Sequence, residues 1–162
     1  MDIDLSFIKN EYFFDTVKEY LERLSESGKE INGVILFGSL AKGNAIYSSE
    51  IISDVDLLVI FANNELPKDH RKRTDLKIDL MGITLSGVDS IWLTQIEFEK
   101  SIQNKVDIIL SILDEAIILY DPINLIKLQK QKLFQELEKK GVIKREKYWI
   151  WPLNHLGEEI EW

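Results

Sequence analysis

One run of seven residues, Val55 to Phe61 (VDLLVIF), constrains the fold more than any other part of the sequence. The run is apolar almost throughout and rich in residues that favour a β-strand. A strand without polar alternation is covered on both faces, so we expect it in the centre of a sheet. Two acidic residues, Asp54 and Asp56, stand where this strand begins. The sequence therefore places charged groups at one end of a buried strand.

Helix-like and strand-like segments alternate along the 162 residues. Apolar spacing of three and four residues predicts helices, and short β-leaning runs predict strands. The expected helices cover 5–27, 40–45 and 68–81, and the expected strands cover 31–37, 55–61, 88–93 and 116–120. A capping box at Thr94–Glu97 predicts another helix, and Asp121-Pro122 begins a long one that ends at Gly141. This alternation predicts an α/β (α+β) fold, a small mixed sheet flanked by helices, with a C-terminal helical extension.

The charge is distributed unevenly. Residues 1–121 carry 12 basic and 22 acidic side chains, whereas residues 122–147 carry 8 basic and 3 acidic ones. We therefore divide the chain into a body, 1–121, which includes the N-terminal helix, and a C-terminal helix with an aromatic tail, 122–162. The apolar stripe of that helix packs either on the body or on a second copy in a homodimer. The tail contains Tyr148, Trp149, Trp151 and Trp162.

Composition excludes several classes of protein. Cysteine is absent and only two histidines, His70 and His155, are present. Thiol nucleophiles, disulfide scaffolds and cysteine metal sites are therefore ruled out, and both histidines are expected to be surface residues. The formal charge of −8 argues against bulk binding to nucleic acid. The acidic N-terminus and the lack of an apolar run of about 18 residues predict a cytoplasmic protein without membrane contact.

The acidic pair has a chemical meaning when it is read with a second motif. Alternate side chains of a strand share a face, so Asp54 and Asp56 point the same way, about 7 Å apart along the backbone. Two neighbouring carboxylates repel each other, and hard oxygen ligands suit Mg²⁺ or Mn²⁺. Gly38-Ser39 ends the preceding strand, where a glycine and free N–H groups let a phosphate approach. A metal beside a phosphate cradle predicts phosphoryl or nucleotidyl transfer.

These motifs together resemble a known family. Gly38-Ser39-Leu40-Ala41-Lys42-Gly43 followed by Ser53-Asp54-Val55-Asp56-Leu57-Leu58-Val59 is similar to the signature of the DNA polymerase beta-like nucleotidyltransferases, and within them to the minimal nucleotidyltransferase group. The resemblance covers roughly residues 30–120. Fourteen residues separate Ser39 from Asp54, more than is common in that group. The extra residues are expected to lengthen the loop Ile46–Ser53.

The resemblance implies a nucleotidyltransferase fold and a third carboxylate on a neighbouring strand, which completes the metal site and acts as the base. Asp89, on the strand 88–93, matches that pattern. Asp79 is the alternative, although a helix over 68–81 would make it a surface residue. The metal ligands and catalytic residues are then Asp54, Asp56 and Asp89. Gly38, Ser39 and Lys42 are the residues expected to bind the nucleotide, most simply ATP.

The implied activity is the Mg²⁺-dependent transfer of a nucleoside monophosphate from an NTP to a hydroxyl. Minimal nucleotidyltransferases often pair with a HEPN-domain protein, and some act as antitoxins that adenylylate a tyrosine of that partner. The acceptor could instead be a small molecule or an RNA end. An alternative is a non-catalytic module that binds a partner protein. A third reading is RNA binding through the basic segment 122–147.

The cluster His70-Arg71-Lys72-Arg73 is expected to be an exposed helix face rather than a substrate contact.

Overall fold

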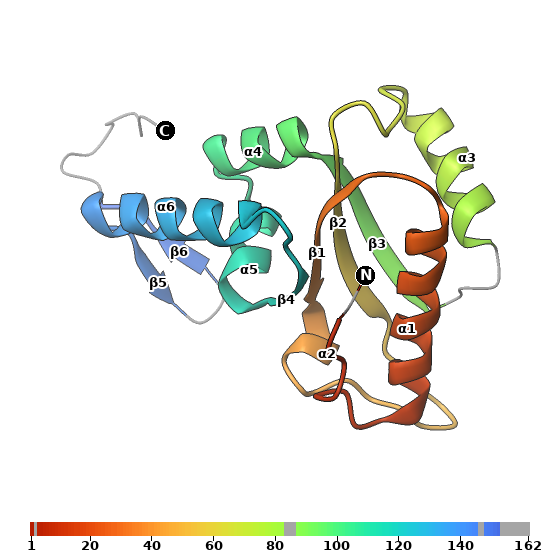
Figure 1. Cartoon of the computed structure of the whole chain (residues 1–162). Helices are drawn as coiled ribbons and strands as arrows, with labels where there is room; N and C mark the ends of the chain where they lie inside the picture. Colours follow the sequence, from red (N-terminus) through yellow and green to blue (C-terminus); the bar gives the residue numbers. More distant parts are fainter. Residues whose placement is uncertain (2, 83–86, 146–147, 153–162) are drawn as a thin grey trace.

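A four-stranded mixed sheet forms the centre of the molecule (Figure 1). The computed structural model describes residues 1, 3–82, 87–145 and 148–152. The strands are β1 (Ile31–Phe37), β2 (Val55–Phe61), β3 (Val88–Thr94) and β4 (Ile117–Tyr120), in the order β3-β2-β1-β4. Strand β1 is antiparallel to β2 and β4, whereas β2 and β3 are parallel. The predicted fold class is confirmed, and VDLLVIF is an interior strand of the sheet.

Helices cover both faces of the sheet. Figure 1 shows α1 (Glu11–Glu26) and α3 (His70–Met81) on one side. On the other side lie α4 (Gln95–Gln103), α5 (Asp107–Glu115) and α6 (Leu125–Lys139). The short helix α2 (Gly38–Ala41) follows β1 directly. Helix α3 connects the parallel strands β2 and β3, as parallel pairing requires a crossover.

The apolar run of β2 serves two separate cores. Leu57, Val59 and Phe61 pack in one cluster with the buried residues of α1. Leu58 and Ile60 point the other way and pack with buried residues of α4, α5 and α6. Because both faces of β2 are covered, its sequence lacks the polar alternation of a strand with one wet face.

The N-terminal helix is shorter than predicted. It begins at Glu11 rather than at residue 5, because the Asn10 side chain caps it by accepting a hydrogen bond from the Phe13 N–H at 3.3 Å. Leu5 and Ile8 are buried in the same cluster as α1, but from the segment that precedes the helix. Their spacing reflects burial rather than helical structure, which is why the stripe was misleading.

The last long helix also begins later than predicted. Asp121 is not its first capping residue, since α6 begins at Leu125 after Asn124, which has a left-handed φ of 54°. The Asp121 carboxylate nevertheless accepts hydrogen bonds from the backbone N–H groups of Ile126 and Lys127, at 3.1 and 3.0 Å. Asp121 therefore stabilises the start of α6 although it lies outside the helix. Its negative charge also interacts favourably with the positive, N-terminal end of the helix dipole.

The apolar stripe of α6 packs on the sheet of its own chain. Ile126 lies against Gly33 of β1, where a Cβ would overlap its side chain, and Leu133 and Leu137 are buried. After α6 the aromatic tail forms a two-stranded hairpin, β5 (Ile143–Arg145) and β6 (Tyr148–Ile150), which the sequence analysis did not predict. Trp162 lies outside the described residues. Within the described ranges, no helix is both long and apolar enough to span a membrane.

Candidate active site

The turn after β1 is shaped around one carboxylate. Phe37, the last residue of β1, is paired with Asp56 of β2. Gly38 then adopts a left-handed φ of 70°. A Cβ at Gly38 would overlap the Asp56 carboxyl group, so only glycine allows the turn and the carboxylate to be neighbours. Ser39 follows in α2, whose first N–H groups lack partners within the helix. The structure thus brings Gly38-Ser39 and Asp56 together.

The sheet register brings a second carboxylate beside the first. In the parallel pair of β2 and β3, Asp56 lies opposite Asp89. Asp54 stands two residues before Asp56, just outside β2, and is exposed, as is Asp89. Asp56 is half-buried. The three acids that were singled out from the sequence therefore gather at the end of the sheet where β2 and β3 begin.

Asp79 takes a different position. It is exposed on α3, a helix that contacts α1 on the opposite side of the sheet from α4–α6. Asp56 shares its face with Leu58, which packs toward α4–α6. The register with Asp56 belongs to Asp89, so the geometry favours Asp89 as the third acid.

Like charges repel one another within this group of acids. Partial burial raises the pKa of Asp56 above its ordinary value, and the charges of Asp89 and Asp54 raise it further. In the described part of the chain, no lysine, arginine or histidine forms an ion pair with any of the three. A bound cation would relieve this repulsion.

The donor set suits a hard divalent metal that is held partly by substrate. Among the described residues, no three histidine, aspartate or glutamate side chains lie close enough together to enclose a metal ion. Mg²⁺ rarely needs such a cage, because it is commonly bound by one or two carboxylates together with substrate phosphates and water. Asp56 and Asp89 in register, with Asp54 beside them and the Gly38 turn alongside, fit that mode.

Lys42 has a protein partner in this structure. Its ammonium group forms an ion pair with Glu115 at the end of α5, and both side chains are more than a third exposed. Glu115 also accepts a hydrogen bond from Lys144 of β5 at 3.0 Å. The hydrogen bonds from Lys42 and Lys144 lower the pKa of Glu115 below its ordinary value. Because exposed pairs contribute little free energy, Lys42 is able to exchange Glu115 for another anion.

The basic cluster 70–73 contains one residue with a structural role. Arg73 is only 12% exposed and pairs with Glu97 at 2.9 Å, and it also donates to the carbonyl oxygens of Pro67 and Trp92. His70, Arg71 and Lys72 are exposed, as predicted for a helix face.

Lys77 is a residue that the sequence reasoning missed. It is half-buried on α3 and donates a hydrogen bond to the Ser90 carbonyl oxygen, next to Asp89 in the chain. Burial lowers the pKa of Lys77 below its ordinary value, and the charge of Asp89 opposes that shift. The available signal was its spacing of four from Arg73, which places both on the side of α3 that meets β3.

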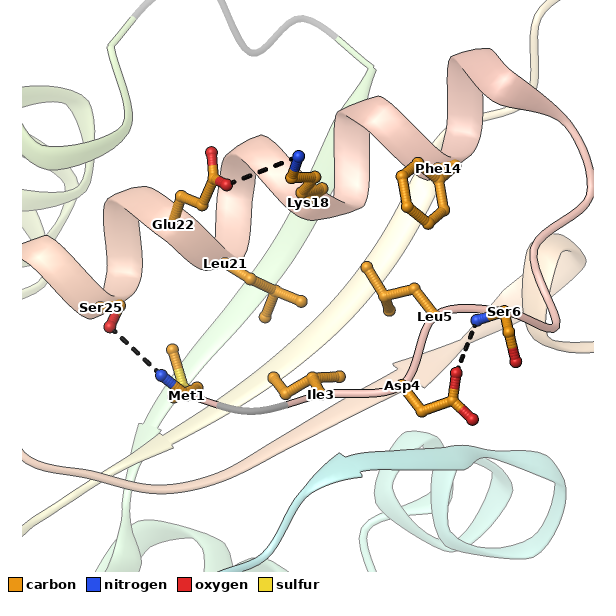
Figure 2. A pocket seen from close by; sticks show the side chains of 10 residues that line it. All are labelled: Met1, Ile3, Asp4, Leu5, Ser6, Phe14, Lys18, Leu21, Glu22 and Ser25. Atoms are coloured by element: carbon orange, nitrogen blue, oxygen red, sulfur yellow. Dashed lines mark hydrogen bonds and ion pairs between the residues drawn. The ribbon is translucent and has the colours of Figure 1, made fainter.

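A separate cavity lies between the N-terminal segment and α1 (Figure 2). The N-terminal ammonium group donates to Ser25 Oγ at 3.5 Å, and Lys18 pairs with Glu22 at its edge at 3.9 Å. None of the candidate site residues line it. The lining consists of Met1, Ile3, Asp4, Leu5, Ser6, Phe14, Lys18, Leu21, Glu22 and Ser25.

The sequence matches a family described as "Polymerase beta, Nucleotidyltransferase" over residues 15–122. A crystal structure of a candidate nucleotidyltransferase from Sulfolobus solfataricus is 20% identical, with 67% of this chain and 79% of that chain covered and a TM-score of 0.45. A toxin–antitoxin with AMP-PNP is 17% identical, with 75% and 86% covered and a TM-score of 0.46. A mutant of the toxin–antitoxin MntA–HpeT is 16% identical, with 75% and 86% covered and a TM-score of 0.47. No curated protein sequence matches this chain significantly.

Proposed function

The chain belongs to the polymerase beta nucleotidyltransferase family, and from that premise we propose that it transfers a nucleoside monophosphate from an NTP, with ATP as the first candidate, to a hydroxyl group. The observation that carries this proposal is the meeting of three features at one end of the sheet. Gly38 admits the Asp56 carboxylate, and Asp56 lies in register with Asp89. Phosphate contact and paired acids are the parts that the reaction needs.

Each residue has a role that follows from its place. Asp54, Asp56 and Asp89 would hold Mg²⁺, or Mn²⁺, together with the triphosphate oxygens. The metal, when bound, supplies positive charge to the phosphate oxygens. The Gly38-Ser39 turn would hold the triphosphate through its backbone N–H groups and the serine hydroxyl. Lys42 would leave Glu115 to contact the phosphates.

The chemical step is a substitution at phosphorus. The acceptor hydroxyl oxygen forms a bond to the α-phosphorus, and the bond from that phosphorus to the bridging oxygen breaks, so pyrophosphate leaves. The Asp89 carboxylate takes the hydroxyl proton, because Asp89 is exposed and free to meet an acceptor from solvent. We further propose that the acceptor belongs to a partner protein of the HEPN type, as in an antitoxin.

A labelling experiment tests the transfer. The wild-type protein is incubated with α-labelled ATP, Mg²⁺ and the product of the adjacent gene, and label on protein is measured. We expect Asp56→Asn, which loses a metal ligand, and Asp89→Asn, which loses a metal ligand and the base, each to lower the rate by about a thousandfold or more. Asp79→Asn is the matched control and should retain the wild-type rate. Equal rates for Asp89→Asn and wild type would contradict the role of Asp89.

A second candidate is a non-catalytic module that acts by binding a partner protein. The observation behind it is that the described residues do not enclose a metal position by themselves, so that metal binding would depend on a bound nucleotide. The two candidates differ in metal-dependent ATP binding. A wild-type protein whose melting temperature does not respond to ATP with Mg²⁺, and which still binds the adjacent gene's product, would establish the second candidate.

A further inference from the structure

The loop that joins the Gly38-Ser39 turn to Asp54 exposes an unusual amount of apolar surface. Four large side chains, those of Ile46, Tyr47, Ile51 and Ile52, are between 48% and 60% exposed. Single exposed apolar residues are common, but four within seven residues form a patch. These four residues are called the loop patch below.

The loop patch is held in an ordered conformation. The base of the loop is closed by the Ser53 N–H donating to the Ile46 carbonyl oxygen at 2.8 Å. Its tip is closed by the Ser48 N–H donating to the Ile51 carbonyl oxygen at 2.9 Å and by the Ile51 N–H donating to Ser48 Oγ at 3.0 Å. The Tyr47 ring stacks on Tyr12 with centroids 4.8 Å apart. The apolar side chains are therefore exposed to solvent on a loop whose conformation is fixed by hydrogen bonds and ring stacking.

The patch continues into a groove beside α2. Phe13 contacts the Tyr47 ring edge-on, with centroids 6.2 Å apart. Phe13 also lines a groove with Phe7, Ile8, Leu40 and Ala45, and the rest of the lining is Lys9, Asn10 and Gly43. A partner that covers the loop patch thus finds a neighbouring groove, lined mainly by apolar residues, for one of its own side chains. Such a pairing of a patch and a pocket is typical of protein interfaces.

The position and charge of the loop patch indicate what binds there. The loop ends at Ser53, next to Asp54, so an occupant of the patch lies beside the candidate active site. Within the loop itself, residues 44–54, the chain has no lysine or arginine but has Glu50 and Asp54. A loop without basic side chains offers no counter-charge to the phosphates of RNA. A small acceptor is not large enough to cover four large apolar side chains, whereas a folded protein is.

We propose that the loop patch and its groove dock the acceptor of the reaction, and that this acceptor is a folded protein that presents an apolar surface beside the hydroxyl that is modified. This inference rests on the proposed function and names the acceptor's class and its docking surface. Docking would hold the hydroxyl near Asp89 and so contribute to kcat/KM for the protein acceptor, without affecting ATP binding.

The test compares two charge substitutions at equally exposed isoleucines. Ile51→Glu places a charge in the loop patch, and Ile123→Glu is the matched control, since Ile123 is 56% exposed and follows β4 at the other end of the sheet. Each protein is incubated with α-labelled ATP, Mg²⁺ and a gel-filtered soluble extract of the source cells. Label is counted in the protease-sensitive and the ribonuclease-sensitive fractions. ATP·Mg²⁺ binding is measured separately by the shift in melting temperature.

We expect Ile51→Glu to lower protease-sensitive labelling at least tenfold, while Ile123→Glu and the conservative Ile51→Leu retain the wild-type rate. All three variants should show the wild-type melting temperature and the wild-type ATP shift. Wild-type labelling by Ile51→Glu would overturn the inference, and so would label found mainly in the ribonuclease-sensitive fraction. A homodimer that Ile51→Glu dissociates without loss of labelling would assign the patch to a second copy instead. If the wild type neither binds ATP nor labels anything, the proposed function fails, and the inference fails with it.

Discussion

Acidic side chains have opposite electrostatic surroundings at the two ends of the β2–β3 pair. Where the strands begin, Asp56 lies against Gly38 and in register with Asp89, without a cation partner among the described residues. Where the strands end, Glu97 accepts hydrogen bonds from Arg73 and from the Thr94 N–H, and the Thr94 hydroxyl accepts from the Glu97 N–H. The acids at the first end have no ion-pair partner among the described residues, whereas the protein itself supplies the ion pair and the hydrogen bonds of Glu97 at the second end. We call these the unsatisfied end and the satisfied end.

The pKa directions show the same contrast. Burial and two neighbouring acids raise the pKa of Asp56. Burial also acts to raise the pKa of Glu97, but the hydrogen bonds and charge of Arg73 and the capping hydrogen bonds outweigh it, so the pKa of Glu97 is lowered. Unsatisfied charge in a folded protein costs stability and marks candidate sites of function. The opposite pKa directions indicate that Glu97 stabilises the fold, whereas Asp56 belongs to a candidate site of function.

The largest effect on stability is expected from breaking the satisfied end. Arg73→Ala removes three hydrogen-bond partners and leaves Glu97 without its counter-ion. We expect a loss of about 2–3 kcal/mol, as for hydrogen bonds to charged groups, seen as a melting temperature about 5–10 °C lower. Thermal unfolding measures it.

The matched control for this change is Arg71→Ala, on an exposed position of the same helix. It should leave the melting temperature within about 2 °C of the wild type. Equal melting temperatures for Arg73→Ala and Arg71→Ala would show that the Arg73–Glu97 pair does not stabilise the fold.

A smaller effect of opposite sign is expected from neutralising the unsatisfied end. The folded state raises the pKa of Asp56 above the unfolded value of 3.8, so it binds the proton more tightly than the unfolded chain does. Stability is therefore lost as the pH rises from that value through the raised pKa. Because Asp56 is only half-buried, solvent screens this repulsion, so Asp56→Asn should raise the melting temperature at pH 7 by no more than about 2–4 °C.

The pH dependence of the melting temperature distinguishes relief of charge repulsion from improved packing as the cause of the stabilisation. The difference in melting temperature between Asp56→Asn and the wild type should be greatest at neutral pH and shrink toward zero below pH 3.8. Added Mg²⁺ should stabilise the wild type and not the variant, which narrows the gap. A difference that is constant with pH would exclude electrostatic repulsion as its source.

The smallest effect concerns Glu115, which lies beside the unsatisfied end and pairs with Lys42. Glu115→Gln should change the melting temperature by less than about 2 °C, because the pair is exposed. If Lys42 serves the triphosphate, its release should tighten ATP binding by up to about fivefold, the equivalent of ~1 kcal/mol.

Titration calorimetry with ATP and Mg²⁺ checks the Glu115→Gln prediction, and the double variant Lys42→Gln with Glu115→Gln serves as its control. The gain in affinity should vanish in the double variant. A gain that persists there would assign the effect to the lost negative charge rather than to Lys42.

Local signals in the sequence predicted the strands well and the helix starts poorly. Strands 31–37 and 55–61 have the expected bounds because their apolar runs end at turn residues that any fold would use. The helices α1 and α6 begin several residues later than predicted. Leu5 and Ile8 have helical spacing but lie in an irregular segment, and Asp121 accepts hydrogen bonds from the start of α6 without being its capping residue. The β5–β6 hairpin was missed, since three-residue strands carry too little pattern to detect.

The sequence by itself determined the parts of the candidate site that are local in the chain. Gly38-Ser39 after one strand and Asp54-Val55-Asp56 at the start of another are fixed by the period of two and by glycine's freedom at positive φ. Only the tertiary structure decided which distant acid faces Asp56 and which acid occupies Lys42. The register of β2 and β3 chose Asp89 over Asp79, and the end of α5 brought Glu115 to Lys42. Both results depend on how segments far apart in the chain pack against one another, and no local pattern encodes that packing.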